Sequence, residues 1–398
     1  MKILLTVPCV RTGIEFYSRL YPMPLGLVSI AAYIREHGFK DVEIKDFLIP
    51  PKRLMIKPPQ SFHGKHMSFI HYGQTYEEVE NWVQNNINKF DLIGTTSMQV
   101  NTMEDGVCKV VDIIKRHTDA PIVVGGYSAT TNSDFILNQS KADYVIRGEG
   151  ELPFLNFLVD YENGKIPERG VYNRHFIQME NLDDLPFPAW DLIDTNAYPK
   201  YQSRKRIVLV TSRGCPFPCT FCSVKCIMGR ETNDGFQPFW RGHSSEHVVK
   251  QVKWLYEKFG ARYICFLDDN FLLDINRTKE ILDGIESLNL KNAMFYIEEG
   301  IMVKQAAEHP EIITQLVRMK FENVVLGLES WSEKTIEHIK KPETVEQFKK
   351  AVATFNNLHY TPSVFYILGF RTDTIESMLE GLMELSQHKI WIRVNNLH

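Results

Sequence analysis

This sequence of 398 residues lacks any apolar run near the roughly 18 residues that a membrane-spanning helix needs. The apolar stretch at its N-terminus, MKILLTVPCVRT, is too short for the hydrophobic region and cleavage site of a signal peptide. An excess of charge is also missing, because 45 basic and 49 acidic residues leave a net charge of −4. Such a balance does not favour nucleic acid as a partner. We therefore expect a cytoplasmic protein with no membrane span and no nucleic-acid partner.

Cysteine is scarce as well, with seven in the whole chain, so a secreted disulfide framework is not expected. Three of the seven nevertheless lie close together in the stretch RGCPFPCTFCSV, which begins at Arg213. They are Cys215, Cys219 and Cys222, separated by three residues and then by two. This concentration of thiols predicts metal ligands.

Four kinds of site use cysteines at such short spacing: a zinc site, a disulfide knot, a redox pair and an iron–sulfur cluster. Structural zinc needs four ligands, usually as two pairs, and Cys226 on the same short loop would give the metal no second element to tie down. A redox pair needs only CxxC and leaves Cys215 unexplained. Iron–sulfur clusters are held by thiolates. A four-iron cluster would use all three cysteines as ligands. Its fourth iron would then have no cysteine ligand and would be open.

The first part of the chain, residues 1–150, alternates strand-like apolar runs with amphipathic stretches. This alternation predicts an α/β domain with a doubly wound parallel sheet of the Rossmann or flavodoxin type. The predicted strands are residues 2–7, 42–47, 92–97, 121–126 and 144–147, and the predicted helices are 26–37 and 102–117. Ligands of such sheets sit at the carboxyl ends of the strands, where we find Thr95, Thr96, Ser97, Gly125 and Gly126.

Two segments depart from this alternation. Residues 50–74 are too long and too rich in proline for a routine crossover loop. They are interpreted either as a surface excursion or as a lid over the substrate that carries Lys57, His63, Lys65, His66 and His71. Residues 151–203 are rich in turns and prolines, and we interpret them as a linker.

The last part of the chain, residues 204–398, starts a second alternation that predicts a partial (β/α)6 barrel of the TIM type. Chemistry in such barrels gathers at the carboxyl ends of the strands, and the cysteine stretch directly follows the first strand. The predicted strands are residues 207–211, 263–267, 293–297, 323–328, 364–368 and 390–394, with helices such as 245–259 and 335–358 between them.

The cysteine spacing, with Phe221 just before the last cysteine, resembles the signature of radical S-adenosylmethionine (SAM) enzymes. The resemblance implies that Cys215, Cys219 and Cys222 hold a 4Fe–4S cluster whose open iron binds SAM. An external electron donor of the flavodoxin or ferredoxin type would then drive cleavage of SAM to a 5′-deoxyadenosyl radical. Three further segments match the family in order, namely FLDDNF, GLES and GFRTDT. Together with the cysteine motif, these segments imply that SAM is contacted by Phe221, Phe266, Asp268, Glu329, Ser330 and Gly369.

The N-terminal part resembles the cobalamin-binding domain that precedes the barrel in B12-dependent radical SAM enzymes. The matching segments are PMPLGLVSIAAYIREHGF, DLIGTTSMQVN, IVVGGYSATTN and DYVIRGEGE, and LDDLPFPAWDLID is typical of the same subfamily's linker. The resemblance implies cobalamin beside Thr96, Ser97, Gly125, Gly126, Tyr127 and Ser128. None of the 13 histidines lies in an Asp-x-His-x-x-Gly motif, so the resemblance implies a corrin with no histidine on its cobalt.

Three features depart from the family pattern. Tyr127 and Ser128 replace the usual Pro-His after the glycine pair, and Trp331 follows GLES where a small residue is common. Trp331 is interpreted either as a wall of the substrate cavity or as a packed aromatic side chain. The sequence ends at His398, just after the sixth predicted strand, whereas relatives continue with a segment over the cavity. We expect closure by the loop near His63, by a partner chain, or by a further segment.

The function expected from this resemblance is methylation of an unactivated carbon, or of phosphorus, in a small-molecule or natural-product substrate. SAM would be used twice, once to methylate cobalamin and once to form the radical. Two alternatives stay open: a B12-dependent oxidative cyclase or rearrangement enzyme without methyl transfer, and a non-enzymatic cobalamin or iron–sulfur sensor. A methylthiotransferase is not expected, because only Cys9 and Cys108 precede the barrel. No residue that acts chemically on the substrate is identified.

Overall fold

The computed structural model describes residues 1–13, 22–62, 65–97, 104–165 and 167–396. Its internal contacts divide the chain into two units. The first unit comprises Met1–Glu180 and Asp184–Lys200, and the second comprises Asn181–Asp183 and Tyr201–His398. Most of the segment interpreted as a linker therefore belongs to the first unit. None of the described helices has the length and apolarity needed to cross a membrane.

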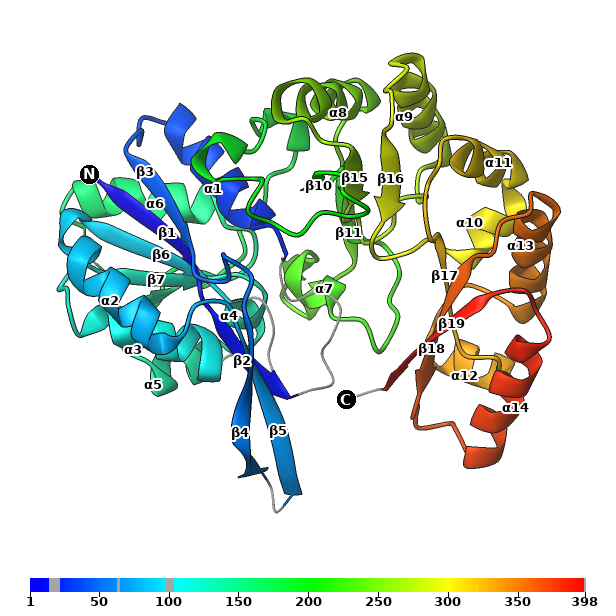
Figure 1. Ribbon diagram of the computed structural model, residues 1–398, viewed down its shortest axis with the longest axis horizontal. Helices are drawn as coiled ribbons and strands as arrows, with labels where there is room; N and C mark the ends of the chain where they lie inside the picture. The colour runs from blue at the N-terminus through cyan, green and yellow to red at the C-terminus, as the bar shows by residue number, and fades with distance from the viewer. Residues whose placement is uncertain (14–21, 63–64, 98–103, 166, 397–398) are drawn as a thin grey trace. The chain divides into compact units, whose positions relative to one another are not determined.

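The first unit is built on a parallel sheet, as the sequence predicts, with six strands in place of the five predicted (Figure 1). All of its neighbouring strands pair in parallel. The strands, in spatial order, are β3 (Val42–Asp46), β1 (Ile3–Val7), β6 (Leu92–Thr96), β7 (Ile122–Gly125), β8 (Tyr144–Val145) and β9 (Gly170–Val171). Strand β9 lies in the segment interpreted as a linker, and two residues are too few for a periodic signal in the sequence.

Helices cover both faces of this sheet (Figure 1). Successive strand side chains point to opposite faces, so Ile3 and Leu5 join one core cluster while Leu4 joins the other. One face packs on α1 (Leu25–Glu36) and α6 (Glu151–Glu162). The other packs on α2 (Tyr76–Asn86), α3 (Lys109–Lys115) and α5 (Ser133–Gln139). The carboxyl ends of β6 and β7 thus stand on a rigid two-sided core.

The proline-rich excursion forms a hairpin of β4 (Arg53–Phe62) and β5 (Lys65–Tyr72), and β5 also pairs with β2 (Val10–Gly13). His71 is buried, and its Nε2 atom lies 2.7 Å from the Gln74 carbonyl oxygen, which gives this histidine a structural role. His63 and the side chains of Lys57, Lys65 and His66 lie outside the described part of the chain. A lid role for the hairpin stays a prediction.

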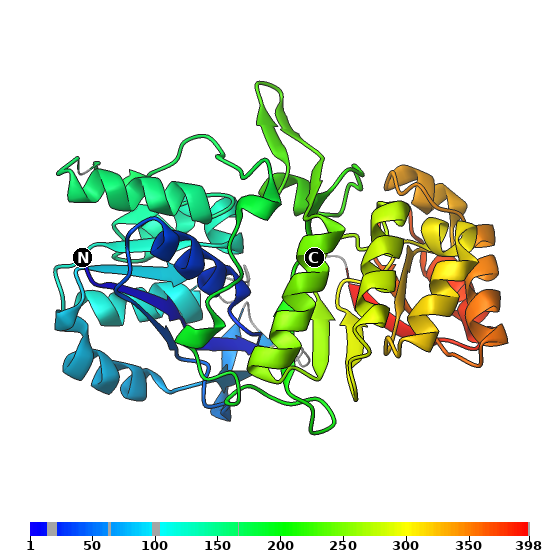
Figure 2. The same cartoon turned by 90° about the horizontal axis from the view of Figure 1, so that it is seen from above.

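The second unit is the predicted partial barrel, with six parallel strands in chain order (Figures 1 and 2). Bridges from Phe295 to Phe321 and from Ile301 to Leu326 join its two three-stranded halves. The strands are β10 (Arg206–Leu209), β15 (Tyr263–Phe266), β16 (Met294–Ile297), β17 (Val325–Glu329), β18 (Ser363–Leu368) and β19 (Trp391–Asn396). The helices between them are α8 (Ser245–Phe259), α9 (Ile275–Ser287), α10 (Val303–Glu308), α11 (Pro310–Arg318), α12 (Glu333–His338), α13 (Val345–Asn357) and α14 (Ile375–Ser386).

The single helix expected over residues 335–358 is wrong, because the chain forms α12 and α13 there. Pro342 disfavours helical backbone at the residue before it, and Lys340 has a left-handed φ of 57°. Thr344 then starts α13 with a capping box to Gln347. The break between the helices creates a short loop beside the cysteine stretch.

The cysteine stretch begins inside a strand rather than after one. Strand β11 (Ser212–Cys215) pairs with β14 (Phe239–Gly242), and the insertion between them holds α7 (Val224–Ile227) and a hairpin of β12 (Arg230–Thr232) and β13 (Gly235–Gln237). Gly214 has φ 82°, and a Cβ atom there would lie 2.0 Å from the Phe239 carbonyl oxygen. The approach of β14 therefore requires glycine just before the first cysteine.

We predict that Gly214→Ala destabilises the apo protein more than Gly235→Ala does. Both glycines have positive φ, but a Cβ atom at Gly235 would meet nothing within 4 Å. Gly235→Ala thus carries only backbone strain of about 1–3 kcal/mol, whereas Gly214→Ala adds a clash with backbone. Thermal unfolding followed by circular dichroism measures the difference. Equal midpoints for the two variants would show that the strand pairing does not constrain Gly214.

Candidate active site

The three clustered cysteines occupy the loop that leaves β11. Cys215 ends the strand, and the amide of Cys222 donates to the Cys219 carbonyl oxygen at 3.2 Å. All three are partly buried free thiols. Burial raises the pKa of Cys219 to about 11, and the neighbouring Cys222 and Cys215 thiols add to that rise. Bringing three thiolates together is unfavourable without a cation, so the arrangement suits a shared metal group.

Contacts with two other elements fix this loop. The Thr220 amide donates to the Ile339 carbonyl oxygen at 2.9 Å, and the Cys219 Sγ atom lies 4.0 Å from the carbonyl oxygen of Lys340. On the other side, the Asn270 Nδ2 atom lies 4.0 Å from the Cys215 Sγ atom. The α12–α13 loop and the end of β15 therefore flank the thiols.

Asp268 and Phe266, both predicted SAM contacts, have fully buried side chains. The carboxylate of Asp268 accepts hydrogen bonds from the Thr211 amide at 3.1 Å, the Thr211 hydroxyl at 2.6 Å and the Ser212 hydroxyl at 2.6 Å. The ring of Phe266 packs on other aromatic rings of the barrel core, including Phe271. These contacts give both side chains a structural role, and their contact with SAM stays a prediction.

Glu329 ends β17 beside an irregularity in its pairing, and it has a left-handed φ of 68°. Its carboxylate is buried and accepts a 2.8 Å hydrogen bond from the Lys341 ammonium. The hydroxyl of the next residue, Ser330, accepts from the Ser332 amide at 3.2 Å. Strained backbone of this kind gathers at functional sites, so Glu329 is the most distinctive of the predicted SAM residues.

Phe221 and Phe370, the residue after Gly369, form an aromatic pair in this region. The Phe221 ring meets the Phe370 ring edge-on, with centroids 5.7 Å apart, and lies 6.0 Å from the Lys341 ammonium. The amide of Gly369 donates to the Asp373 carboxylate at 3.2 Å. The structure thus brings Phe221, Glu329 and the segment from Gly369 to within reach of one another around Lys341.

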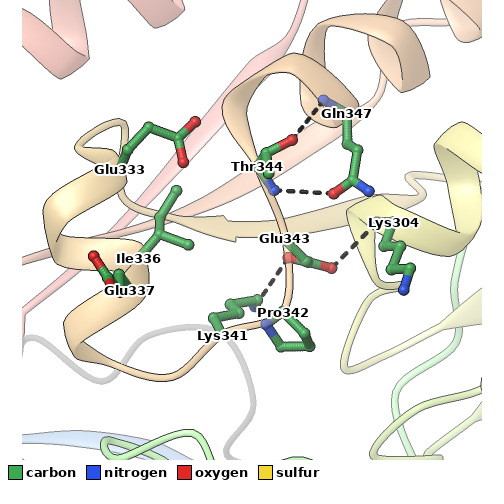
Figure 3. Close-up of a pocket in the computed structure, with 9 residues that line it drawn as sticks. All are labelled: Lys304, Glu333, Ile336, Glu337, Lys341, Pro342, Glu343, Thr344 and Gln347. Atoms are coloured by element: carbon green, nitrogen blue, oxygen red, sulfur yellow. Dashed lines mark hydrogen bonds and ion pairs between the residues drawn. The ribbon is translucent and has the colours of Figure 1, made fainter.

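Lys341 and Glu343 are residues that the sequence analysis missed. They line a cavity of about 340 Å³ together with Lys304, Glu333, Glu337 and Gln347 (Figure 3). The Lys341 ammonium lies 3.6 Å from the Glu343 carboxylate, whose pKa is raised to about 6 by burial. Burial opposes the charge on Lys341, but Glu329 and Glu343 together raise its pKa overall. The sequence signals here, Pro342 and Thr344, mark a loop but do not indicate the role of its charged side chains.

Trp331 is a packed aromatic residue, one of the two interpretations given above. Its ring lies 6.0 Å from Phe348 and 5.8 Å from His388. Its Cβ atom would meet a Cβ on Gly381 of α14 at 2.9 Å. The side chain therefore packs between α13 and α14.

The residues predicted to contact cobalamin lie at the ends of β6 and β7 and the start of α4 (Tyr127–Thr131). The Ser97 amide donates to Gly125, and the Ser128 amide donates to Ser97. Gly126 has φ 94°, and a Cβ there would lie 2.7 Å from the Thr96 Oγ1 atom. Tyr127 is exposed.

Two hydroxyls in this group have no hydrogen-bond partner among the described residues. The Oγ atoms of Ser97 and Ser128 are both buried and unpaired. An unpaired buried hydroxyl costs about 1–3 kcal/mol. The two serines therefore fit a site at which a polar ligand supplies the missing partners.

Asp183, His243 and His247 form a second cluster of possible metal ligands. The Asp183 carboxylate lies 3.2 Å from the His243 Nδ1 atom and accepts from the Ser244 amide at 2.9 Å. The two histidine rings stack at 4.3 Å with only 18° between their planes. A histidine nitrogen binds a metal in the plane of its ring, so one ion bound by both histidines would have to lie in both ring planes. Two stacked, nearly parallel rings have no such common position near their nitrogen atoms. We interpret this cluster as a cap on α8.

Family models match both units of the chain. The model of the radical SAM superfamily matches residues 209–385, and the model of the B12-binding domain matches residues 17–158.

Relatives with similar sequences include an uncharacterised methyltransferase of Pyrococcus horikoshii, 29% identical over 95% of this chain and 76% of its own length. The cytidylyl-2-hydroxyethylphosphonate methyltransferase of Streptomyces wedmorensis is 24% identical over 87% of this chain and 68% of its own. The anaerobic magnesium-protoporphyrin IX monomethyl ester cyclase of Synechocystis is 22% identical over 70% of this chain and 56% of its own.

Two solved structures share the fold. The methyltransferase TsrM from Kitasatospora setae, with cobalamin and a 4Fe–4S cluster bound, has a TM-score of 0.68 at 15% identity. The alignment covers 99% of this chain and 72% of TsrM. The cobalamin-dependent enzyme OxsB, with aqua-cobalamin and SAM bound, has a TM-score of 0.70 at 18% identity over 96% of this chain. This chain spans 51% of OxsB.

We predict that Cys215→Ala, Cys219→Ala and Cys222→Ala each lose most of the iron bound after anaerobic reconstitution. Each change removes one of the three thiolates that meet at the end of β11. Cys226→Ala is the matched control, because Cys226 lies on α7, outside the three-cysteine motif. We expect the Cys226→Ala protein to keep its iron. Iron and sulfide analysis measures the content. Loss of iron from Cys226→Ala would show that a fourth cysteine belongs to the site.

We predict that Ser97→Ala weakens cobalamin binding by about threefold to tenfold, the cost of one lost hydrogen bond. The stability of the apo protein should stay the same or rise, because this hydroxyl has no described partner. Ser140→Ala is the opposite control: its hydroxyl donates to Ile136 at 2.7 Å and accepts from Ala142 at 3.2 Å. We expect that control to lose stability but not affinity. Spectroscopic titration with hydroxocobalamin and thermal unfolding measure both, and unchanged affinity in Ser97→Ala would contradict this site.

Proposed function

We propose that this chain, which belongs to the cobalamin-dependent radical SAM enzymes, methylates an unactivated carbon or phosphorus atom of a small molecule. The observation that carries the proposal is the convergence of Cys215, Cys219 and Cys222 at the end of β11, in a chain whose other unit matches the B12-binding domain. The methyltransferases of Pyrococcus and Streptomyces support methyl transfer in particular.

The three cysteines would hold a 4Fe–4S cluster, and the small residues at the ends of β6 and β7 would hold cobalamin. When bound, these groups and SAM supply a carbon radical and a transferable methyl group. We assign the cobalamin contacts to Thr96, Ser97, Gly125, Gly126, Tyr127 and Ser128. The two unpaired serine hydroxyls are the strongest support for this assignment.

We assign SAM to the region around Glu329. A carboxylate can accept two hydroxyl hydrogen bonds, and Lys341 fixes Glu329 from one side at 2.8 Å. The edge-on pair of Phe221 and Phe370 would shield this region from water. Asp268 and Phe266 would support the SAM site indirectly, because their contacts hold the end of β15 in place.

The substrate is proposed to be a small molecule, and the electron donor an external protein of the flavodoxin or ferredoxin type. The TsrM structure determined with tryptophan as substrate supports a small molecule. Closure of the barrel mouth by a partner chain stays a prediction.

A cyclase is the second candidate, because the Synechocystis relative carries that activity. A cyclase would use the same cofactor sites without transferring a methyl group. The two functions therefore differ in the products they form from SAM.

We predict that anaerobically reconstituted protein with cobalamin, candidate small-molecule substrates and a strong reductant releases both S-adenosylhomocysteine and 5′-deoxyadenosine from SAM. Methyl transfer consumes one SAM for each product, so both accumulate together in the presence of a substrate. Liquid chromatography with mass spectrometry quantifies them.

Protein reconstituted without cobalamin is the control, and it should release 5′-deoxyadenosine but no S-adenosylhomocysteine. If the complete protein also releases only 5′-deoxyadenosine, the cyclase assignment replaces methyl transfer. If it binds SAM and cleaves none, the chain is a sensor.

A further inference from the structure

Lys341 is an unusual lysine for a loop residue, because its side chain is only 9% exposed. Lysine is almost never buried unless it is paired. Its ammonium lies 2.8 Å from a Glu329 oxygen. It also lies 3.6 Å from a Glu343 oxygen, as Figure 3 shows. The Lys341 ammonium thus contacts two carboxylates, and one of them, Glu329, ends β17.

This charged group lies directly beside the cysteine loop. Lys340, the preceding residue, places its carbonyl oxygen 4.0 Å from the Cys219 Sγ atom. The Lys341 ammonium lies 6.0 Å from the ring of Phe221, which precedes Cys222. The Lys341 charge also lowers the pKa of Cys219, which burial otherwise raises. The positive charge of Lys341 therefore interacts electrostatically with a thiol that would hold the cluster.

A purely structural ion pair explains this arrangement poorly. Buried ion pairs are often no more stabilising than apolar residues of the same size. Here the pair also lies where the backbone is left-handed at two residues, Glu329 (φ 68°) and Lys340 (φ 57°). Left-handed backbone at two residues and two buried charges are costly together, and such costs gather at functional sites.

We propose that Lys341 is a buried positive charge that sets the reduction potential of the cluster held by Cys215, Cys219 and Cys222, and that Glu329 partly offsets this charge. The proposal rests on the proposed function, because it requires a cluster at these cysteines. The net charge around an iron–sulfur cluster is one determinant of its potential. A nearby cation favours the reduced, more negative cluster and so raises the potential. In a buried site solvent screens this effect little.

We predict that Lys341→Met shifts the cluster potential to a more negative value and that Lys341→Arg keeps it near that of the wild type. Glu329→Gln should shift it to a more positive value, because the Lys341 charge is then less offset. The double variant Lys341→Met with Glu329→Gln should return toward the wild type. The measurement is a redox titration of the reconstituted full-length protein, followed by electron paramagnetic resonance without SAM.

Lys340→Met is the matched control, because it removes an exposed lysine from the adjacent position. Solvent screens the charge of an exposed lysine, so the reduction potential of the cluster in Lys340→Met should equal that of the wild type. Iron content distinguishes the two proposals, because a wild-type protein that assembles no cluster refutes the proposed function. A normal cluster with an unchanged potential in Lys341→Met, or an equal shift in Lys340→Met, overturns the role of Lys341. If Lys341→Met does not fold, an unchanged potential in Glu329→Gln overturns it.

Discussion

The fastening of the cysteine loop to β15 is the constraint on which the arrangement of the site depends. Two adjacent aspartates make it: Asp268 accepts from Thr211 and Ser212, and Asp269 accepts from the Gly214 amide at 3.0 Å. Burial raises the pKa of Asp269 to about 6. Because these bonds fix the residues just before Cys215, the position of the first thiol follows from the barrel core. The rest of the cysteine loop is held by contacts of Thr220 and Cys219 with backbone carbonyl groups of the α12–α13 loop.

The barrel and sheet could be predicted from the sequence because their strands are apolar runs of ordinary length. Residues 263–267 and 92–97, for example, contain β15 and β6 almost to the residue. The α12–α13 break was missed, although Pro342 and Thr344 are recognisable signals, because amphipathic residues continue on both sides of them. Strands such as β9 and β12 are too short for any periodicity.

The site was predicted less completely, because motifs name residues but not their partners. The spacing of Cys215, Cys219 and Cys222 is a local property and was visible in the sequence. The pairing of Lys341 with Glu329 arises only when β17 and the α12–α13 loop fold against each other. Likewise, nothing in the sequence indicates that the hydroxyls of Ser97 and Ser128 are buried with no partner among the described residues.

Hydrogen-bond satisfaction therefore divides the candidate residues into two groups. Asp268 has three donors on its carboxylate and no exposed surface, so a ligand could add little to it. Ser97 and Ser128 have buried oxygens with no partner in the described part of the chain, and so does the side-chain oxygen of Asn270 beside Cys215. Buried polar groups in folded proteins are nearly always paired. In the proposed sites, these three atoms are the positions at which a bound cofactor could supply the missing hydrogen-bond partner.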